Sequence, residues 1–185
     1  MRRRSVRLKG HDYRQPGAYF VTICTYRWAP LFGTLVNGRM ALNPLGQMVE
    51  KEWLRTAAVR PYVRLDEYIV MPNHFHGIVM ITDDGRGTAR RASTTEQFGR
   101  PIPRSLPTII RSFKSAATHR IKKDRGTPGK PVWQRNYYEH IVRTDRALNR
   151  IRAYIHQNPA HWHLDRYNPE AVGSDEFELQ LQAGL

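Results

Sequence analysis

The sequence predicts an α+β fold in which helices pack on an antiparallel sheet. Three observations support this class. The first half of the chain is dominated by β-prone runs at residues 18–26, 31–42 and 63–81. Helical periodicity occurs between these runs at residues 43–58, and again after them at residues 105–123 and from Thr144 onward. With 185 residues and 40% hydrophobic content, the chain can form one domain with its own core, so we expect a single domain over residues 1–185.

Local signals define the elements of the first half. A Pro-Gly pair precedes the buried strand expected at residues 18–26, and an Asn-Gly pair supplies the tight turn of a hairpin over residues 31–42. Asn43 suits a helix cap and Pro44 the first helical position, so a helix is expected to run to about residue 58. A strand then begins near Val63 and a second strand follows it.

In the second half, a strand is expected at residues 133–143, and Thr144 caps a last helix that Pro159 ends or bends. Three other segments do not read as core elements. They are a basic arm at residues 1–10, a mobile basic loop at residues 83–104 and a C-terminal tail at residues 164–185.

The charge indicates a polyanionic partner. Thirty Lys and Arg against 16 Asp and Glu give a formal charge of +14, which favours nucleic acid first and an anionic membrane surface second. No apolar run approaches the roughly 18 residues that a membrane span needs, and no apolar segment follows the basic N-terminus. The single cysteine, Cys24, lies in an apolar run, so we expect a cytoplasmic protein.

Two histidines stand at the start of the strand that ends at Ile81. Residues two apart in a strand share a face, so His74 and His76 present their imidazoles side by side while Phe75 points into the core. Two neutral imidazoles can bind one divalent cation, with a third ligand from elsewhere. The alternative is a pair of satisfied polar histidines.

The last helix carries a second candidate pair. Tyr154 and Asn158 are four residues apart, so their side chains lie on one side of the helix. Near the histidines, the amide oxygen of Asn158 would complete a three-ligand metal site, and the Tyr154 hydroxyl would supply a nucleophile. The alternative is that Tyr154 packs in the core and Asn158 caps the helix end.

Candidate DNA contacts lie on the helix at residues 105–123 and in the following strand. A one-sided basic helix can bind phosphates, and aromatic side chains can stack on unpaired bases. The alternative for the basic residues is a solvated charged face. The candidates are Arg111, Lys114, Arg120, Lys122, Tyr137 and Tyr138.

Four sequence motifs, MPNHFHG, FKSAATHRI, WQRNYYEHIVR and YIHQNP, carry a resemblance that spans about residues 8–162. The chain resembles the single-tyrosine HUH transposases, and most of all the REP-associated tyrosine transposases. The resemblance implies a ferredoxin-like palm, Mg²⁺ or Mn²⁺ on His74 and His76, and attack by Tyr154 on single-stranded DNA. Related enzymes have a metal-binding glutamine where this chain has Asn158.

By this resemblance the protein is a metal-dependent endonuclease and strand transferase. It would act on hairpin DNA through a 5′-phosphotyrosine intermediate without ATP, as a monomer or homodimer. Two alternatives are a non-catalytic hairpin-DNA-binding regulator and a nickase like the relaxases or replication initiators. The intact set of His74, His76 and Tyr154 disfavours the first, and the lack of any sign of a helicase or primase domain disfavours the second.

Overall fold

The computed structural model describes Leu8 and residues 11–83, 102–126 and 129–173. The expected basic arm, apart from Leu8, lies outside the described residues. Most of the expected basic loop and the end of the expected C-terminal tail lie outside them as well.

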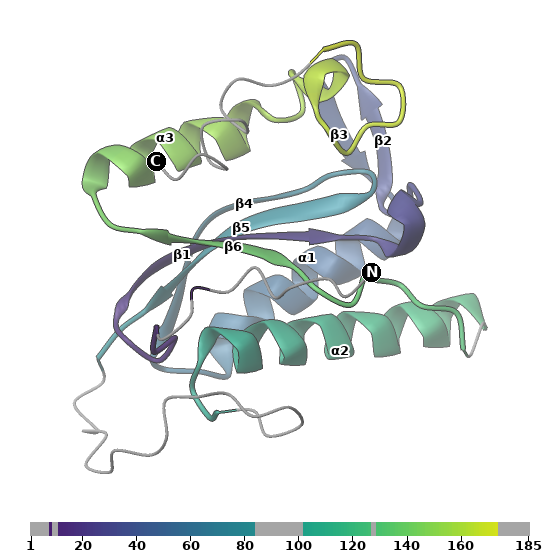
Figure 1. Ribbon diagram of the computed structural model, residues 1–185. Helices are drawn as coiled ribbons and strands as arrows, with labels where there is room; N and C mark the ends of the chain where they lie inside the picture. Colours follow the sequence, from purple (N-terminus) through teal and green to yellow (C-terminus); the bar gives the residue numbers. More distant parts are fainter. Residues whose placement is uncertain (1–7, 9–10, 84–101, 127–128, 174–185) are drawn as a thin grey trace.

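A four-stranded antiparallel sheet forms the centre of the molecule. Its strand order is β4 (Val63–Val70), β5 (His74–Ile81), β1 (Gly17–Cys24) and β6 (Tyr138–Val142). The strands β2 (Gly33–Val36) and β3 (Arg39–Leu42) form a separate hairpin at one end of this sheet (Figure 1). Its turn uses left-handed backbone at Asn37 and Gly38, as the Asn-Gly pair predicts.

Helices cover both faces of the sheet. Figure 1 shows α1 (Pro44–Ala58) and α2 (Leu106–Arg125) on one face and α3 (Asp145–Gln157) on the other. Alternating residues of each strand supply the two cores, because neighbouring side chains point to opposite faces. The predicted α+β class is therefore confirmed. One core includes Trp53, Phe75 and Phe113, and the other includes Phe20, Ile78 and Ile151.

The predicted caps hold the helix starts. The Asn43 side chain accepts a hydrogen bond from the Gly46 amide at 2.9 Å, and Thr144 accepts one from the Ala147 amide at 3.1 Å. Each cap satisfies an amide that has no partner within its helix. Within the described residues, no helix combines the length and apolar character needed to cross a membrane.

The strand expected at residues 133–143 is shorter than predicted. β6 starts at Tyr138, and Trp133 makes only an isolated bridge to Thr25. The carbonyls of Gln134 and Arg135 instead accept hydrogen bonds from the Lys114 amino group of α2, at 2.8 and 3.1 Å. These carbonyls turn toward the helix, so the segment does not continue the sheet.

Close packing explains the glycine after the second histidine. A Cβ atom on Gly77 would lie 2.6 Å from Cζ2 of Trp53, a distance that real Cβ contacts essentially never show. The glycine lets α1 place Trp53 directly against β5. The strand that carries the histidines is thereby fixed to the core from behind.

A candidate metal centre beside Tyr154

The histidine pair lies on the face of β5 that α3 covers. Ring centroids of His74 and His76 are 4.5 Å apart, and each side chain is at most 1% exposed. Phe75 points to the opposite face and packs on Trp53 at a centroid distance of 4.6 Å. The strand geometry thus brings the two imidazoles together, as the spacing predicts.

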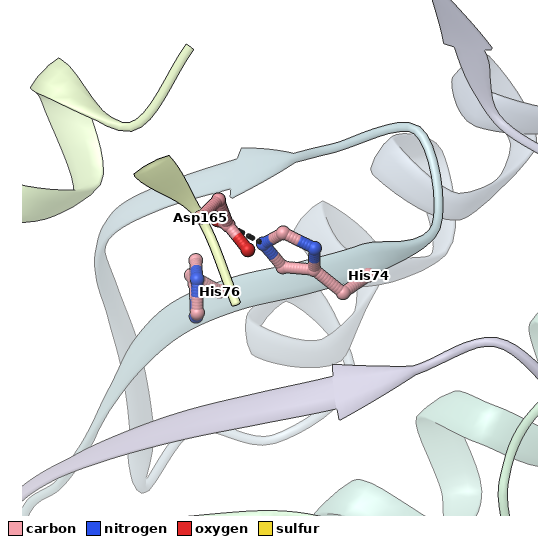
Figure 2. A group of neighbouring side chains, drawn as sticks. All are labelled: His74, His76 and Asp165. Carbon is pink, nitrogen blue, oxygen red and sulfur yellow. Dashed lines mark ion pairs between the residues drawn. The ribbon is translucent and has the colours of Figure 1, made fainter. Parts of the chain in front are cut away.

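Asp165 completes a group of three potential ligands. One ligand atom from each of His74, His76 and Asp165 lies within 4.8 Å of the others, and all three residues are buried. Figure 2 shows the Asp165 carboxylate directed at His74, with Oδ2 3.6 Å from Nε2. The Tyr167 amide donates to Asp165 Oδ1 at 2.7 Å and fixes the carboxylate's orientation.

Sequence reasoning missed Asp165. This residue lies in the segment expected to be a tail, after Pro159 and the short 3-10 helix η2 (Trp162–Leu164). No regular period relates it to the histidines or to Tyr154, so spacing gives no signal. The available signal was only its type, a carboxylate close in sequence to a candidate site.

Asn158 lies next to this group at the end of α3. Its side-chain nitrogen donates to Asp165 Oδ2 at 3.1 Å, while its Oδ1 atom is buried without a hydrogen-bond partner among the described residues. The residue is also the C-cap position of α3. The structure therefore brings Asn158 to the site, and its role as a metal ligand stays a prediction.

Asn73 fixes which nitrogen of His74 carries the hydrogen. Its Nδ2 atom faces the carbonyl oxygens of Trp28 and Tyr167, at 3.2 and 2.6 Å, and must donate to both. Asn73 Oδ1 is then an acceptor, so the His74 Nδ1–H group donates to it at 3.0 Å. In neutral His74 the lone pair is consequently on Nε2, which faces Asp165.

Burial keeps both imidazoles neutral. It lowers the pKa of His74 to about 3, and the nearby Asn158 side chain opposes this shift only in part. Burial also holds the pKa of His76 well below its ordinary value, and the neighbouring His74 lowers it further while Asp165 raises it. Neutral imidazoles are the form that binds cations.

Tyr154 reaches this centre from α3. Its hydroxyl oxygen lies 3.3 Å from Nε2 of His76, whose Nδ1 atom is 2.9 Å from the Thr22 hydroxyl on β1. The Tyr154 ring packs edge-on against Phe20 and His76, at centroid distances of 6.2 and 5.2 Å. The helical tyrosine and the strand histidines therefore meet, as the sequence interpretation requires.

The other two candidate tyrosines lie on opposite sides of the sheet. Tyr137 packs against the core under α1 and α2, and Tyr138 packs against the core under α3. Adjacent residues of an extended segment face opposite ways, which explains this division.

The candidate basic residues lie on α2, on the face of the sheet away from α3 (Figure 1). Arg111 is exposed and Lys122 is half-buried. Lys114 donates to backbone carbonyls, and Arg120 forms an ion pair with the buried Glu52 of α1. The structure does not bring these four residues to the histidine centre.

Fold and site together define an α+β protein with a candidate metal centre next to a buried tyrosine. A similar fold occurs in the REP-associated tyrosine transposase solved in complex with a REP hairpin, with a TM-score of 0.54 and 21% identity. That match covers 83% of this chain and 73% of the transposase. The transposase fold implied by the sequence resemblance is confirmed.

A protein from Haemophilus influenzae strain Rd, described as uncharacterized, is 40% identical to this chain over 169 residues. The match covers 89% of this chain and 92% of that protein, so the chain belongs to the same family. No family model matches the chain.

Proposed function

We propose that this protein is a metal-dependent single-stranded DNA endonuclease and strand transferase of the tyrosine transposase class. One observation carries the proposal. The Tyr154 hydroxyl lies 3.3 Å from His76, inside a buried group that also contains His74 and Asp165. A candidate nucleophile and a candidate cation site therefore share one centre.

The donor atoms fit a divalent cation. His74 Nε2 and Asp165 Oδ2 are 3.6 Å apart, and each presents a lone pair, since the His74 hydrogen is on Nδ1. Buried acceptors that face each other without a hydrogen between them are costly. Asn158 Oδ1 adds another unsatisfied acceptor nearby. Carboxylate and amide oxygens are donors that suit Mn²⁺ or Mg²⁺, and the neutral imidazoles can bind a divalent cation beside them. Such a cation would withdraw charge from the scissile phosphate when bound.

Tyr154 would act as the nucleophile. His76 Nε2 has a single lone pair, so a His76 that serves as a ligand no longer accepts a hydrogen bond from Tyr154. The hydroxyl then points to a neighbouring phosphate instead. The Tyr154 hydroxyl loses its proton as its oxygen forms a bond to phosphorus. The bond from phosphorus to the 3′ oxygen breaks, and the departing 3′ oxygen gains a proton, so one proton is released and one is taken up.

The products are a 5′-phosphotyrosine and a 3′-hydroxyl. Because one phosphate ester bond replaces another, a second 3′-hydroxyl can reverse the step and join strands without ATP. The substrate we propose is hairpin DNA with adjoining unpaired bases. Two findings support it: the charge of +14, and the REP hairpin bound to the transposase of similar fold.

The test is a covalent adduct. Protein incubated with labelled hairpin DNA and Mn²⁺ should form an adduct that survives denaturing electrophoresis, and Tyr154→Phe should abolish it while hairpin binding persists. The variant removes one oxygen and keeps the ring that packs on Phe20. Tyr137→Phe and Tyr138→Phe are matched controls and should keep the adduct. Hairpin binding without any adduct would favour the non-catalytic regulator instead.

A further inference from the structure

The turn after β1 exposes two large aromatic side chains. It is the short helix η1 (Tyr26–Trp28), in which Tyr26 is 42% exposed and Trp28 is 45% exposed. Among the described residues, these two are the aromatic members of the exposed large hydrophobic set. Arg27, between them, is also exposed, and its guanidinium lies 5.4 Å from the centre of the Tyr26 ring.

Hydrogen bonds hold this turn rigidly. The Tyr26 amide donates to the Val132 carbonyl at 2.8 Å, and the Trp28 amide donates to the Thr25 carbonyl at 3.1 Å. Arg27 and Trp28 both have left-handed backbone, with φ of 55° and 54°, which residues other than glycine rarely adopt. Such conformations persist only where the surrounding structure enforces them, and they gather at ligand sites. The two rings are thus presented outward by a fixed backbone.

One amide connects the turn to the candidate metal centre. Asn73 donates to the Trp28 carbonyl at 3.2 Å and accepts from His74 at 3.0 Å. The same Asn73 side chain donates to the Tyr167 carbonyl at 2.6 Å, and the Arg166 guanidinium lies 5.2 Å from the centre of the Tyr167 ring. The exposed aromatic turn therefore adjoins the end of β5 at which His74 stands.

We propose that Tyr26, Arg27 and Trp28 form a stacking platform for unpaired nucleotides next to the scissile phosphate. The inference rests on the proposed function, because it assigns where the single-stranded part of that substrate binds. Every base has a face that stacks on an aromatic ring, and an arginine between two such rings supplies a charge for the backbone phosphate. A blunt duplex offers only the outer face of the terminal base pair at each end, whereas every base of a single strand can be unstacked, so the platform favours single strands.

Fluorescently labelled oligothymidylate and a blunt duplex of equal length are the two probes. Tyr26→Ala and Trp28→Ala should each weaken oligothymidylate binding by on the order of tenfold, as loss of one stacked base does, and should leave duplex binding unchanged. Tyr26→Phe and Trp28→Phe keep a ring and should retain the affinity. Leu54→Ala, at an exposed apolar residue on α1, is the matched control. Equal oligothymidylate affinity in wild type and the alanine variants would overturn the platform.

A second measurement does not depend on the alanine variants folding. Oligothymidylate should quench the tryptophan fluorescence of the wild type, and Trp28→Phe should remove this quenching. Equal quenching in both proteins would count against Trp28 as a stacking residue. If the wild type forms the covalent adduct while the platform variants bind like the wild type, the platform alone fails. If the wild type binds no single-stranded DNA, the platform and the proposed function fail together.

Discussion

At the scale of single residues, the side-chain amide of Asn73 fixes the orientation of His74 in the candidate metal centre. The Nδ2 atom of Asn73 donates to two backbone carbonyls, and its Oδ1 atom accepts from His74. Only an amide side chain can make both kinds of hydrogen bond here. Asn73→Asp should destabilise the fold by about 2 kcal/mol or more, because a buried carboxylate would face the Trp28 and Tyr167 carbonyls. Chemical denaturation measures the effect.

The control for this prediction is an asparagine whose side chain acts only as an acceptor in the hydrogen bond that the structure shows. Asn149 on α3 is exposed and its Oδ1 atom accepts from Arg152 at 3.0 Å, which a carboxylate also does. Asn149→Asp should therefore leave the free energy of unfolding nearly unchanged. A similar loss of stability in both variants would mean that the Asn73 amide is not what matters.

The candidate ligands make a prediction about Mn²⁺ itself. His74→Ala and Asp165→Asn should each weaken Mn²⁺ binding by roughly tenfold or more, since each removes a donor from a group of three. Titration calorimetry of the protein without DNA measures this independently of catalysis. His119→Ala, at an exposed histidine of α2 outside the group, should bind like the wild type. Unchanged affinity in Asp165→Asn would remove this residue from the ligand set.

At the scale of elements, Lys114 ties α2 to the segment that leads into β6. Burial lowers the pKa of Lys114 from 10.5 to about 8, and this segment accepts its hydrogen bonds through two carbonyls. The unfolded chain therefore binds more protons than the folded protein between these two pH values. The free energy of unfolding should rise with pH across that window as the cost of burying the charge disappears.

Lys114→Met isolates this contribution, because methionine keeps an apolar stem and does not titrate. The stability of the wild type relative to Lys114→Met should increase by up to about 3 kcal/mol as the pH rises from about 8 to 10.5. Denaturation in urea at pH values on both sides of the window measures it. Lys123→Met removes an exposed charge from the same helix and controls for net charge. The same pH profile in both variants would contradict the assignment.

Regular elements were predictable because their signals are local. The caps Asn43 and Thr144 bind amides three residues away, and the Asn-Gly turn acts through its own backbone angles; the structure contains all of them. The strand was predicted to start at residue 133 and starts later. Lys114, twenty residues before Gln134, donates hydrogen bonds to the carbonyls of Gln134 and Arg135. The local sequence of the strand does not indicate such a long-range hydrogen-bond partner.

The residues of the candidate site also differ in whether local sequence signals predict them. His74, His76 and Tyr154 lie on a strand and a helix, whose fixed periods make neighbouring side chains predictable. Asp165 lies in irregular backbone after α3, where no period applies, and only the folded chain brings it to His74.

At the scale of the whole molecule, the layers decide which charges can act together. The sequence does not reveal that α2 covers one face of the sheet while α3, the helix that carries Tyr154, covers the other (Figure 1). Nor does it reveal that Arg120 pairs with the buried Glu52. Of the four basic candidates on α2, Arg111 and Lys122 have no such internal role among the described contacts. These two residues of α2 can therefore contact DNA bound at Tyr154 only if the DNA continues from the α3 face of the sheet to the α2 face.

Salt dependence of DNA binding tests this arrangement. Each phosphate contact contributes about 0.7 to the slope of log affinity against log salt for single strands. Arg27 and Arg166 are exposed on segments that Asn73 joins to His74, so Arg27→Gln with Arg166→Gln should lower the slope by the equivalent of about two contacts. Arg111→Gln with Lys122→Gln removes the same charge from the opposite face and should lower it less. A larger decrease from the α2 pair would place the main DNA surface on α2, and the DNA would then have to cross the edge of the sheet to reach Tyr154.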